Sequence, residues 1–125
     1  MLQNTKRAPE KVSLIIAIVD RGKGKRLTAR MHDEGVRFDL CLLGHGTADS
    51  SLLDYLGLGE TEKDIILGGI ETVRARPLLQ KLKQEFSMER AGGGIAFSIP
   101  IVSVGGAQTL GFLAGHEEGE LKNER

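Results

Sequence analysis

Four stretches of the chain carry the hydrophobic pattern of β-strands. Residues 11–20 (KVSLIIAIVD) are apolar at odd and even positions alike, which predicts a strand buried on both faces. Residues 36–44 (VRFDLCLLG) alternate, which predicts a half-buried strand. Residues 62–71 (EKDIILGGIE) predict a third strand, and residues 90–104 (RAGGGIAFSIPIVSV) predict a glycine-rich loop that enters a fourth. Because Pro100 cannot donate to a ladder, the fourth strand is expected at a sheet edge or to be bulged there.

The alternation within these strands predicts two apolar sheet faces. One side of the second strand is apolar at every other position, and we expect it to face the core: Val36, Phe38, Leu40 and Leu42. The second and third strands carry further apolar residues on the face turned away from the helices: Cys41, Leu43, Ile66 and Ile70. Such a face must be covered, and an oligomer that packs its sheets around an axis would cover it.

Two other segments have the pattern of amphipathic helices. Residues 21–35 place Leu27 and Met31 four apart among charged residues, which predicts a short helix. Residues 72–88 have an apolar stripe at four-residue steps: Leu78, Leu82 and Phe86. Pro77 is expected to start this second helix or to lie in its first turn, where its missing N–H costs nothing.

The order of these elements is βαββαβ, which predicts an α+β, ferredoxin-like domain: a four-stranded antiparallel sheet with two helices on one face. We expect this domain to span residues 11–105. The polar residues 1–10 are expected to form a flexible arm, and residues 106–125, which end in charges, a C-terminal tail.

The connection between the second and third strands, residues 44–59 (GHGTADSSLLDYLGLG), is too long for a hairpin turn. Ser51 is a favourable helix N-cap, and Asp54 three residues later completes a capping box. With the leucines that surround Tyr55, this predicts a short helix over residues 50–58.

Composition excludes several classes of protein. Lys plus Arg and Asp plus Glu both number 17, so no global positive field attracts nucleic acid. With four Phe, one Tyr and no Trp, stacking of nucleobases on the sheet is not expected either. A single cysteine, Cys41, rules out an intrachain disulfide and indicates a reducing, cytoplasmic setting. The N-terminus lacks the pattern of a secretory signal, and no stretch approaches the ~20 apolar residues of a membrane helix.

Three segments together resemble a known family. SLIIAIVDRGKGKRL (13–27), FDLCLLGHGT (38–47) and AGGGIAFSIPI (91–101) are similar to the first strand, the second strand with the start of the T-loop, and the B-loop with the last strand of the nitrogen regulatory P-II signalling family. The resemblance covers roughly residues 11–105. It implies a non-enzymatic homotrimer that binds ATP, ADP or another adenine nucleotide between subunits. It also implies regulation of a protein partner, a transporter or an enzyme of nitrogen metabolism, through residues 44–59.

The chain departs from the family at three positions that hold the ligand. Ile95 stands where the family has a phosphate-binding lysine, and Gly46 lies near the place of its T-loop glutamine. The last strand leads into VSVGGAQTL, where the family has an Arg-x-Arg pair. The alternative is therefore a P-II- or CutA-like structural or interaction module that has lost nucleotide binding.

The candidate site residues fall into two groups. Those predicted to bind the ligand are Gly44, His45, Gly46, Thr47, Arg90, Gly92, Gly93 and Gly94. Glycines let several N–H groups converge on a phosphate, and Arg90 adds charge. Those predicted to dock a partner are Ser51, Leu52, Leu53, Tyr55 and Leu56. The turn DRGKGKRL (20–27) lacks the remaining residues of a phosphate-loop motif, and we interpret it as a basic exposed turn, with an anion at the helix N-terminus as the alternative.

The sequence has no group of residues spaced as metal ligands or as a catalytic nucleophile with its base. Cys41 and His45 are ~13 Å apart along an extended strand and cannot share a metal there. Ser50 and Ser51 have no evident base, and no G-x-S-x-G is present. Tyr55 is similar in place to the modified T-loop tyrosine of the family, but its leucine neighbours favour packing.

Overall fold

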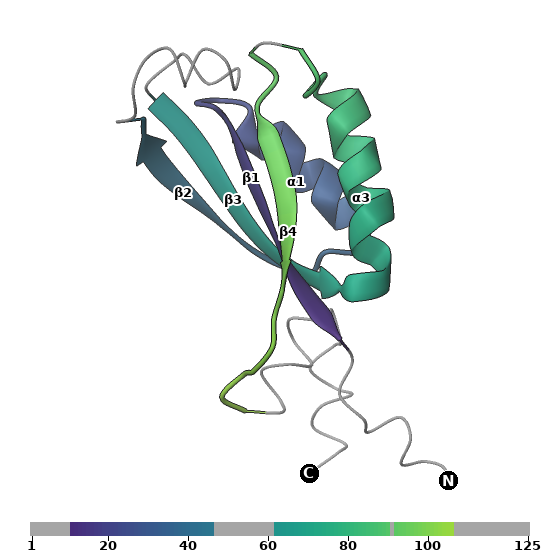
Figure 1. Cartoon of the computed structure of the whole chain (residues 1–125). Coiled ribbons are helices and arrows are strands. Elements are labelled where there is room, and N and C mark those ends of the chain that lie inside the picture. Colours follow the sequence, from purple (N-terminus) through teal and green to yellow (C-terminus); the bar gives the residue numbers. More distant parts are fainter. Residues whose placement is uncertain (1–10, 47–61, 91, 107–125) are drawn as a thin grey trace, which may run out of the picture.

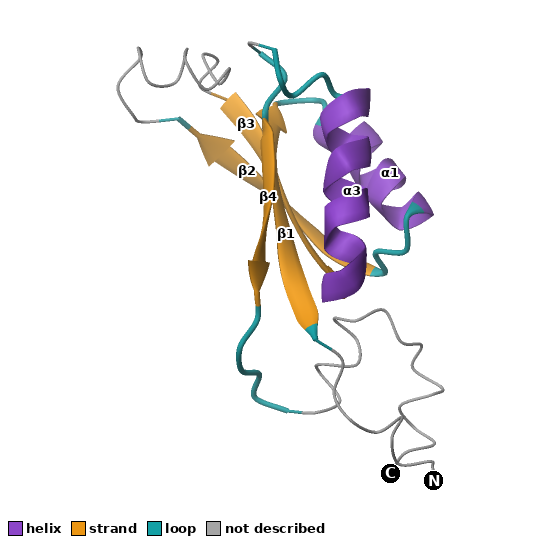
Figure 2. Cartoon of the chain, turned by 45° about the vertical axis from the view of Figure 1, so that its right-hand side comes forward, coloured by secondary structure: helices purple, strands orange, loops and turns teal. Residues whose placement is uncertain are grey.

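The computed structural model describes residues 11–46, 62–90 and 92–106, and it has two layers (Figures 1 and 2). The elements follow the order β1 (Val12–Asp20), α1 (Gly24–Asp33), β2 (Phe38–His45), β3 (Glu62–Glu71), α3 (Thr72–Glu85) and β4 (Ile95–Pro100). Both helices cover the same face of the sheet. The predicted ferredoxin-like fold is confirmed. The predicted arm at residues 1–10, the predicted helix over residues 50–58 and most of the predicted tail lie outside the described residues.

The four strands form one antiparallel sheet in the order β2-β3-β1-β4. β1 is central and lies between β3 and β4, which explains why its sequence is apolar at odd and even positions alike from Leu14 to Val19. β4 is an edge strand, as Pro100 predicted. The Ile101 N–H donates to the Val12 carbonyl at 2.9 Å, so the neighbouring Pro100 nitrogen lies on the outer side of the strand, where no ladder bond is lost.

The core lies between the sheet and the helices. β1 and β3 contribute Ile15, Ala17, Val19, Ile66 and Ile70, each at most 1% exposed. The helices and the turn before β2 add Leu27, Met31, Val36, Ala75, Leu78, Leu82 and Phe86. The predicted stripes of both helices are therefore the buried ones.

The structure reverses the predicted faces of β2. Cys41 pairs with Ile66, and Leu42 pairs with Ile65. Directly opposed residues share a face, and Ile66 is buried under the helices. Leu42, with Phe38 and Leu40, therefore lies on the face turned away from the helices, and the prediction that these residues face the core is wrong. The prediction that Cys41, Leu43, Ile66 and Ile70 face away from the helices is wrong as well, because all four lie on the helix side of the sheet.

The position of Pro77 in its helix also differs from the prediction. It lies in the second turn of α3, which begins at Thr72. The prediction of a first-turn proline is wrong because the Thr72 backbone already continues from β3, its N–H donating to the Lys11 carbonyl at 2.8 Å, so that the helix begins there.

Candidate functional site

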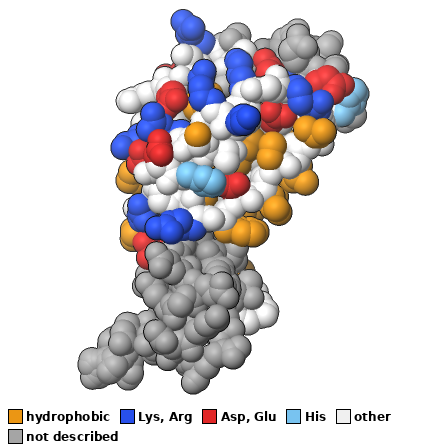
Figure 3. All heavy atoms as spheres, turned by 180° about the vertical axis from the view of Figure 1, so that it is seen from behind, with side chains coloured by type: hydrophobic (Ala, Val, Ile, Leu, Met, Phe, Trp, Pro, Cys, Tyr) orange, Lys and Arg blue, Asp and Glu red, His pale blue; other side chains and the backbone are white. Residues whose placement is uncertain are grey.

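The sheet face turned away from the helices is apolar along all four strands. The register of the sheet places these residues on it: Leu14, Ile16, Ile18, Phe38, Leu40, Leu42, Ile65, Leu67, Ile95, Phe97 and Ile99. Leu40 is 50% exposed and Ile99 45%. Charged side chains concentrate over the helix layer, whereas hydrophobic ones gather along the sheet (Figure 3). We call this surface the open face. A contiguous apolar surface of this kind marks an interaction site.

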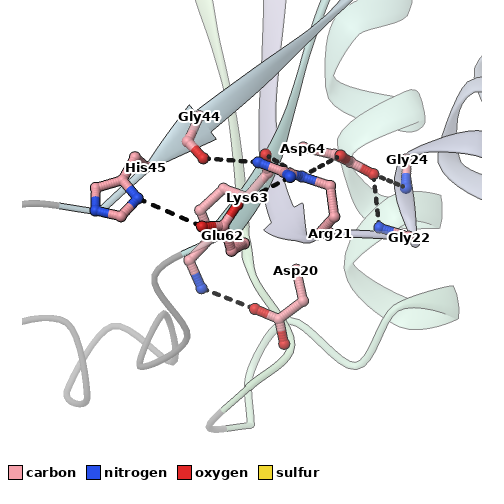
Figure 4. Close-up of polar contacts among 9 residues, drawn as sticks. All are labelled: Asp20, Arg21, Gly22, Gly24, Gly44, His45, Glu62, Lys63 and Asp64. Carbon is pink, nitrogen blue, oxygen red and sulfur yellow. Dashed lines mark hydrogen bonds and ion pairs between the residues drawn. The ribbon is translucent and has the colours of Figure 1, made fainter.

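At one end of the sheet, Arg21 ties the turn after β1 to the end of β2 and the start of β3 (Figure 4). Its Nη2 donates to the Gly44 carbonyl at 2.9 Å, and its Nε donates to the Lys63 carbonyl at 3.2 Å. Its Nη1 lies 2.9 Å from Glu62 Oε1. His45 is beside the same glutamate, with Nδ1 3.6 Å from Glu62 Oε2. Gly44 and His45, both predicted ligand residues, are therefore held in place by a polar network.

Asp64 occupies the helix N-terminus that the turn at residues 20–27 offers. Its Oδ2 accepts the N–H groups of Gly22 and Gly24 at 2.9 and 3.0 Å, and its Oδ1 lies 3.3 Å from Arg21 Nε. Asp64 is 6% exposed, and no side chain next to the helix start caps α1. A protein carboxylate thus takes two of the amides that an external anion at this N-terminus would use.

A basic hollow of about 310 Å³ lies at the N-terminal end of α1. Its lining comes from α1, from the end of α3 and from the loop before β4: Lys23, Arg26, Glu85, Phe86, Ser87, Arg90, Gly92 and Gly93. The Arg26 guanidinium lies 4.3 Å from the centroid of the Phe86 ring. The fold thus brings the predicted Arg90, Gly92 and Gly93 together with Lys23 and Arg26, which the sequence had indicated only as part of an exposed turn.

Two of the glycines in this loop have a steric reason to be glycine. A Cβ on Gly93 would lie 2.1 Å from the Ser87 carbonyl oxygen, and one on Gly94 would lie 2.6 Å from that of Ile18. The Gly93 N–H donates to the Arg90 carbonyl at 3.1 Å. This amide is therefore already used within the loop, and the positive charge of the hollow comes from side chains.

The two groups of predicted ligand residues lie at the same end of the sheet but at opposite edges. Gly44 and His45 are the last residues of β2, with Gly46 directly after them, and Arg90 and Gly92–Gly94 precede β4. With the order β2-β3-β1-β4, three strand spacings of ~4.8 Å separate the edges by about 14 Å. One chain therefore does not bring both groups around a phosphate-sized ligand. Thr47 and the predicted docking residues Ser51, Leu52, Leu53, Tyr55 and Leu56 lie outside the described residues.

A second hollow, about 670 Å³, runs between α3 and β4. Ala75, Leu79, Met88 and Ala96 give it apolar walls, and Arg76 and Lys83 are the cations that line it. It meets the loop before β4 at Gly94.

The remaining titratable groups of the described residues do not gather into a metal cluster, and Cys41 is not activated. Within residues 11–46, 62–90 and 92–106, no three His, Cys, Asp or Glu side chains gather as metal ligands would. Desolvation, with the nearby carboxylates of Asp64 and Asp39, raises the pKa of the Cys41 thiol, which disfavours a reactive thiolate. No helix in the described part of the chain is long and apolar enough to cross a bilayer.

Comparison with known proteins identifies the fold. No family model and no curated protein matches the sequence. GlnK of B. subtilis, solved with ATP, is 13% identical at a TM-score of 0.55 over 73% of this chain and 82% of that one. CPII of Thiomonas intermedia K12, bound to ADP and bicarbonate, is 20% identical at 0.55 over 73% and 86%. CutA1 of Oryza sativa is 14% identical at 0.63 over 88% and 97%. The predicted P-II resemblance is confirmed at the level of the fold, which CutA1 shares.

Proposed function

We propose that this chain is a non-enzymatic signal-transduction module of the P-II type, a divergent member that assembles as a homotrimer. The observation that carries the proposal is the open face, which is apolar on every strand. Three copies packed around an axis would bury it, with the charged helix layer outside. The similar solved structures of GlnK and CPII support the P-II type.

The ligand proposed is an adenine nucleotide bound between subunits. The two predicted groups, Gly44–Gly46 and Arg90–Gly94, lie at opposite sheet edges but at the same end. In a closed ring, the β2 edge of one copy comes beside the β4 edge of the next, so both groups meet in one cleft. Thr47 would extend the first group. GlnK and CPII are solved with ATP and with ADP.

The proposed output is a change in the segment between β2 and β3, which would dock a transporter or an enzyme in the cytoplasm. A ligand shifts such a segment only as far as it binds its states differently. The contacts of Arg21 with Gly44 and Glu62 fix both ends of this segment, next to the proposed cleft. The link to nitrogen metabolism rests on the resemblance alone.

A CutA-like interaction module that has lost nucleotide binding is the second candidate. Ile95 in place of a lysine favours it, as does the likeness to CutA1 over 97% of that chain.

Two measurements test these proposals. Light scattering should give a mass of three times the 13.5 kDa chain, and a monomer at micromolar concentration would refute the assembly. Thermal unfolding with ATP, ADP and AMP, each with and without Mg²⁺, tests the ligand. A nucleotide at 100 times its Kd adds about 2.7 kcal/mol of stability. A trimer whose melting temperature moves with none of them would leave only the CutA-like candidate.

A further inference from the structure

The basic hollow at the start of α1 has positive charge that the described residues do not fully neutralise. Among the residues that the structure describes, the side chains of Lys23 and Arg90 make no hydrogen bond or ion pair. Both line the hollow with Arg26. Three cations therefore converge from two segments that are more than sixty positions apart in the sequence, and two of them have no side-chain partner within residues 11–46, 62–90 and 92–106.

Glu85 is the one acid among the described residues that line the hollow, and its charge is shared between two arginines. Its Oε1 accepts a hydrogen bond from Arg30 Nε at 2.5 Å, and its Oε2 lies 3.8 Å from Arg26 Nε. Arg30 does not line the hollow, so it offsets the carboxylate from behind. Arg26 is fixed between Glu85 and the face of Phe86, which lowers the entropy that it would lose on binding an anion.

Size and polarity restrict what the hollow can take. At about 310 Å³ it is at the small end of ligand pockets, large enough for a phosphate or pyrophosphate group. Phe86, whose ring face is covered by Arg26, is the one large apolar side chain in the lining. Arginine matches phosphate oxygens with paired N–H groups, and lysine adds a compact charge. An apolar ligand would leave these three cations unsatisfied.

We propose that Lys23, Arg26 and Arg90 form a binding site for a phosphate-type anion within a single chain. The site goes beyond the function proposed above because it lies in the helix layer and needs no second subunit. The cations are side chains of the α1 start and of the loop before β4, whereas the amides of Gly22 and Gly24 are given to Asp64. An anion bound here joins α1 to the loop that enters β4.

Titration calorimetry of the full chain with inorganic pyrophosphate, at constant ionic strength, tests the site. Lys23→Ala is the informative variant, because its side chain has no partner within the described residues, so the substitution removes no contact that the structure shows there. The matched control is Lys25→Ala, which removes the same charge from an exposed position on the same turn but outside the hollow. We expect saturable binding by the wild type with a Kd of about 1 mM or tighter.

Lys23→Ala should weaken pyrophosphate binding about tenfold, the effect of losing one charge-assisted hydrogen bond of ~1.4 kcal/mol, while Lys25→Ala binds like the wild type. The same titration with ADP in place of pyrophosphate identifies the source of the phosphate group. If ADP binds more tightly and also depends on Lys23, the site takes a nucleotide. If ADP does not bind, the site takes the free anion. Equal weakening in both alanine variants would reduce the effect to general charge and overturn the proposal. So would a wild type that binds no pyrophosphate, whatever its oligomeric state.

Discussion

Placing a charge on the open face should dissociate the proposed trimer. Leu40→Glu is the sharpest perturbation, because Leu40 lies in the middle of β2, opposite Leu67 on the open face, and is 50% exposed. Leu43→Glu is the matched control. It makes the same substitution three residues along the same strand, at a side chain that is 73% exposed but on the other face, opposite Asp64.

The magnitude follows from burial. Covering a leucine completely is worth ~1.5–3 kcal/mol, so covering the exposed half of Leu40 contributes ~1 kcal/mol per subunit. Three equivalent copies lose ~3 kcal/mol when Leu40 is removed. Each glutamate adds a desolvation cost of several kcal/mol if it is buried in an interface. At 1.4 kcal/mol per factor of ten, the dissociation constant of the trimer should rise at least ~100-fold.

Sedimentation equilibrium over a wide range of protein concentration measures this constant. Leu40→Glu should sediment as a monomer where the wild type and Leu43→Glu sediment as trimers, with unchanged far-ultraviolet circular dichroism in all three. If Leu43→Glu dissociates and Leu40→Glu does not, the face assignment of β2 is wrong. If neither variant changes the mass, the open face is not the interface.

Three further predictions concern single side chains. Asp64→Ala should lower the free energy of unfolding by ~2–4 kcal/mol in urea titration, because it leaves the Gly22 and Gly24 amides without their acceptor and removes one ion pair of Arg21. Asp33→Ala, at a side chain that is 70% exposed, should change it by less than ~0.5 kcal/mol, and similar losses in both would contradict the buried cap. Gly93→Ala should lower the free energy of unfolding by ~1–3 kcal/mol, because its Cβ would overlap the Ser87 carbonyl. Gly105→Ala, with open space around it, should lower it little. Equal unfolding midpoints of the two variants would refute the close approach of Gly93 to Ser87. Cys41 should react with iodoacetamide more slowly than free cysteine at pH 8, since its raised pKa lowers the thiolate fraction there. The difference in rate should shrink as the pH rises above the pKa. A faster rate than that of free cysteine at pH 8 would show that the surroundings of Cys41 favour the thiolate.

Local periodicity was sufficient to predict the order and type of the elements. The hydrophobic pattern of each described strand and helix indicated its type from its own residues alone, as with the four-residue steps of Leu78, Leu82 and Phe86. The face of β2 could not be predicted in the same way. Its apolar alternation fits a strand that faces a core, and it fits a strand that faces another subunit equally well. Only the register with Ile65 and Ile66 separates the two cases.

The basic hollow was only half visible in the sequence. Arg90 and the glycines were predicted because their loop resembles the B-loop of the P-II family, whereas Lys23 and Arg26 looked like an exposed turn. What makes them part of a site is the antiparallel packing of α1 and α3, which brings the first turn of α1 beside Glu85 and Phe86. Such proximity depends on tertiary structure, and no local pattern encodes it. The clustered cations of KGKR were the one available signal.

The two faces of the molecule together determine which sites an assembly leaves accessible. The helix layer is covered by exposed ion pairs, such as Lys81 with Glu34 and Arg30 with Glu85, which contribute little to stability but keep this side in water. Within the described residues, the open face has no comparable polar cover. An assembly that buries the open face must therefore leave the helix layer outside, and the hollow of Lys23, Arg26 and Arg90 stays open to solvent. In the proposed trimer, the end of β2 and the start of β4 would instead lie at the edges between subunits. An anion in the hollow and a ligand in the cleft would then meet at the same loop before β4, one on each side of it.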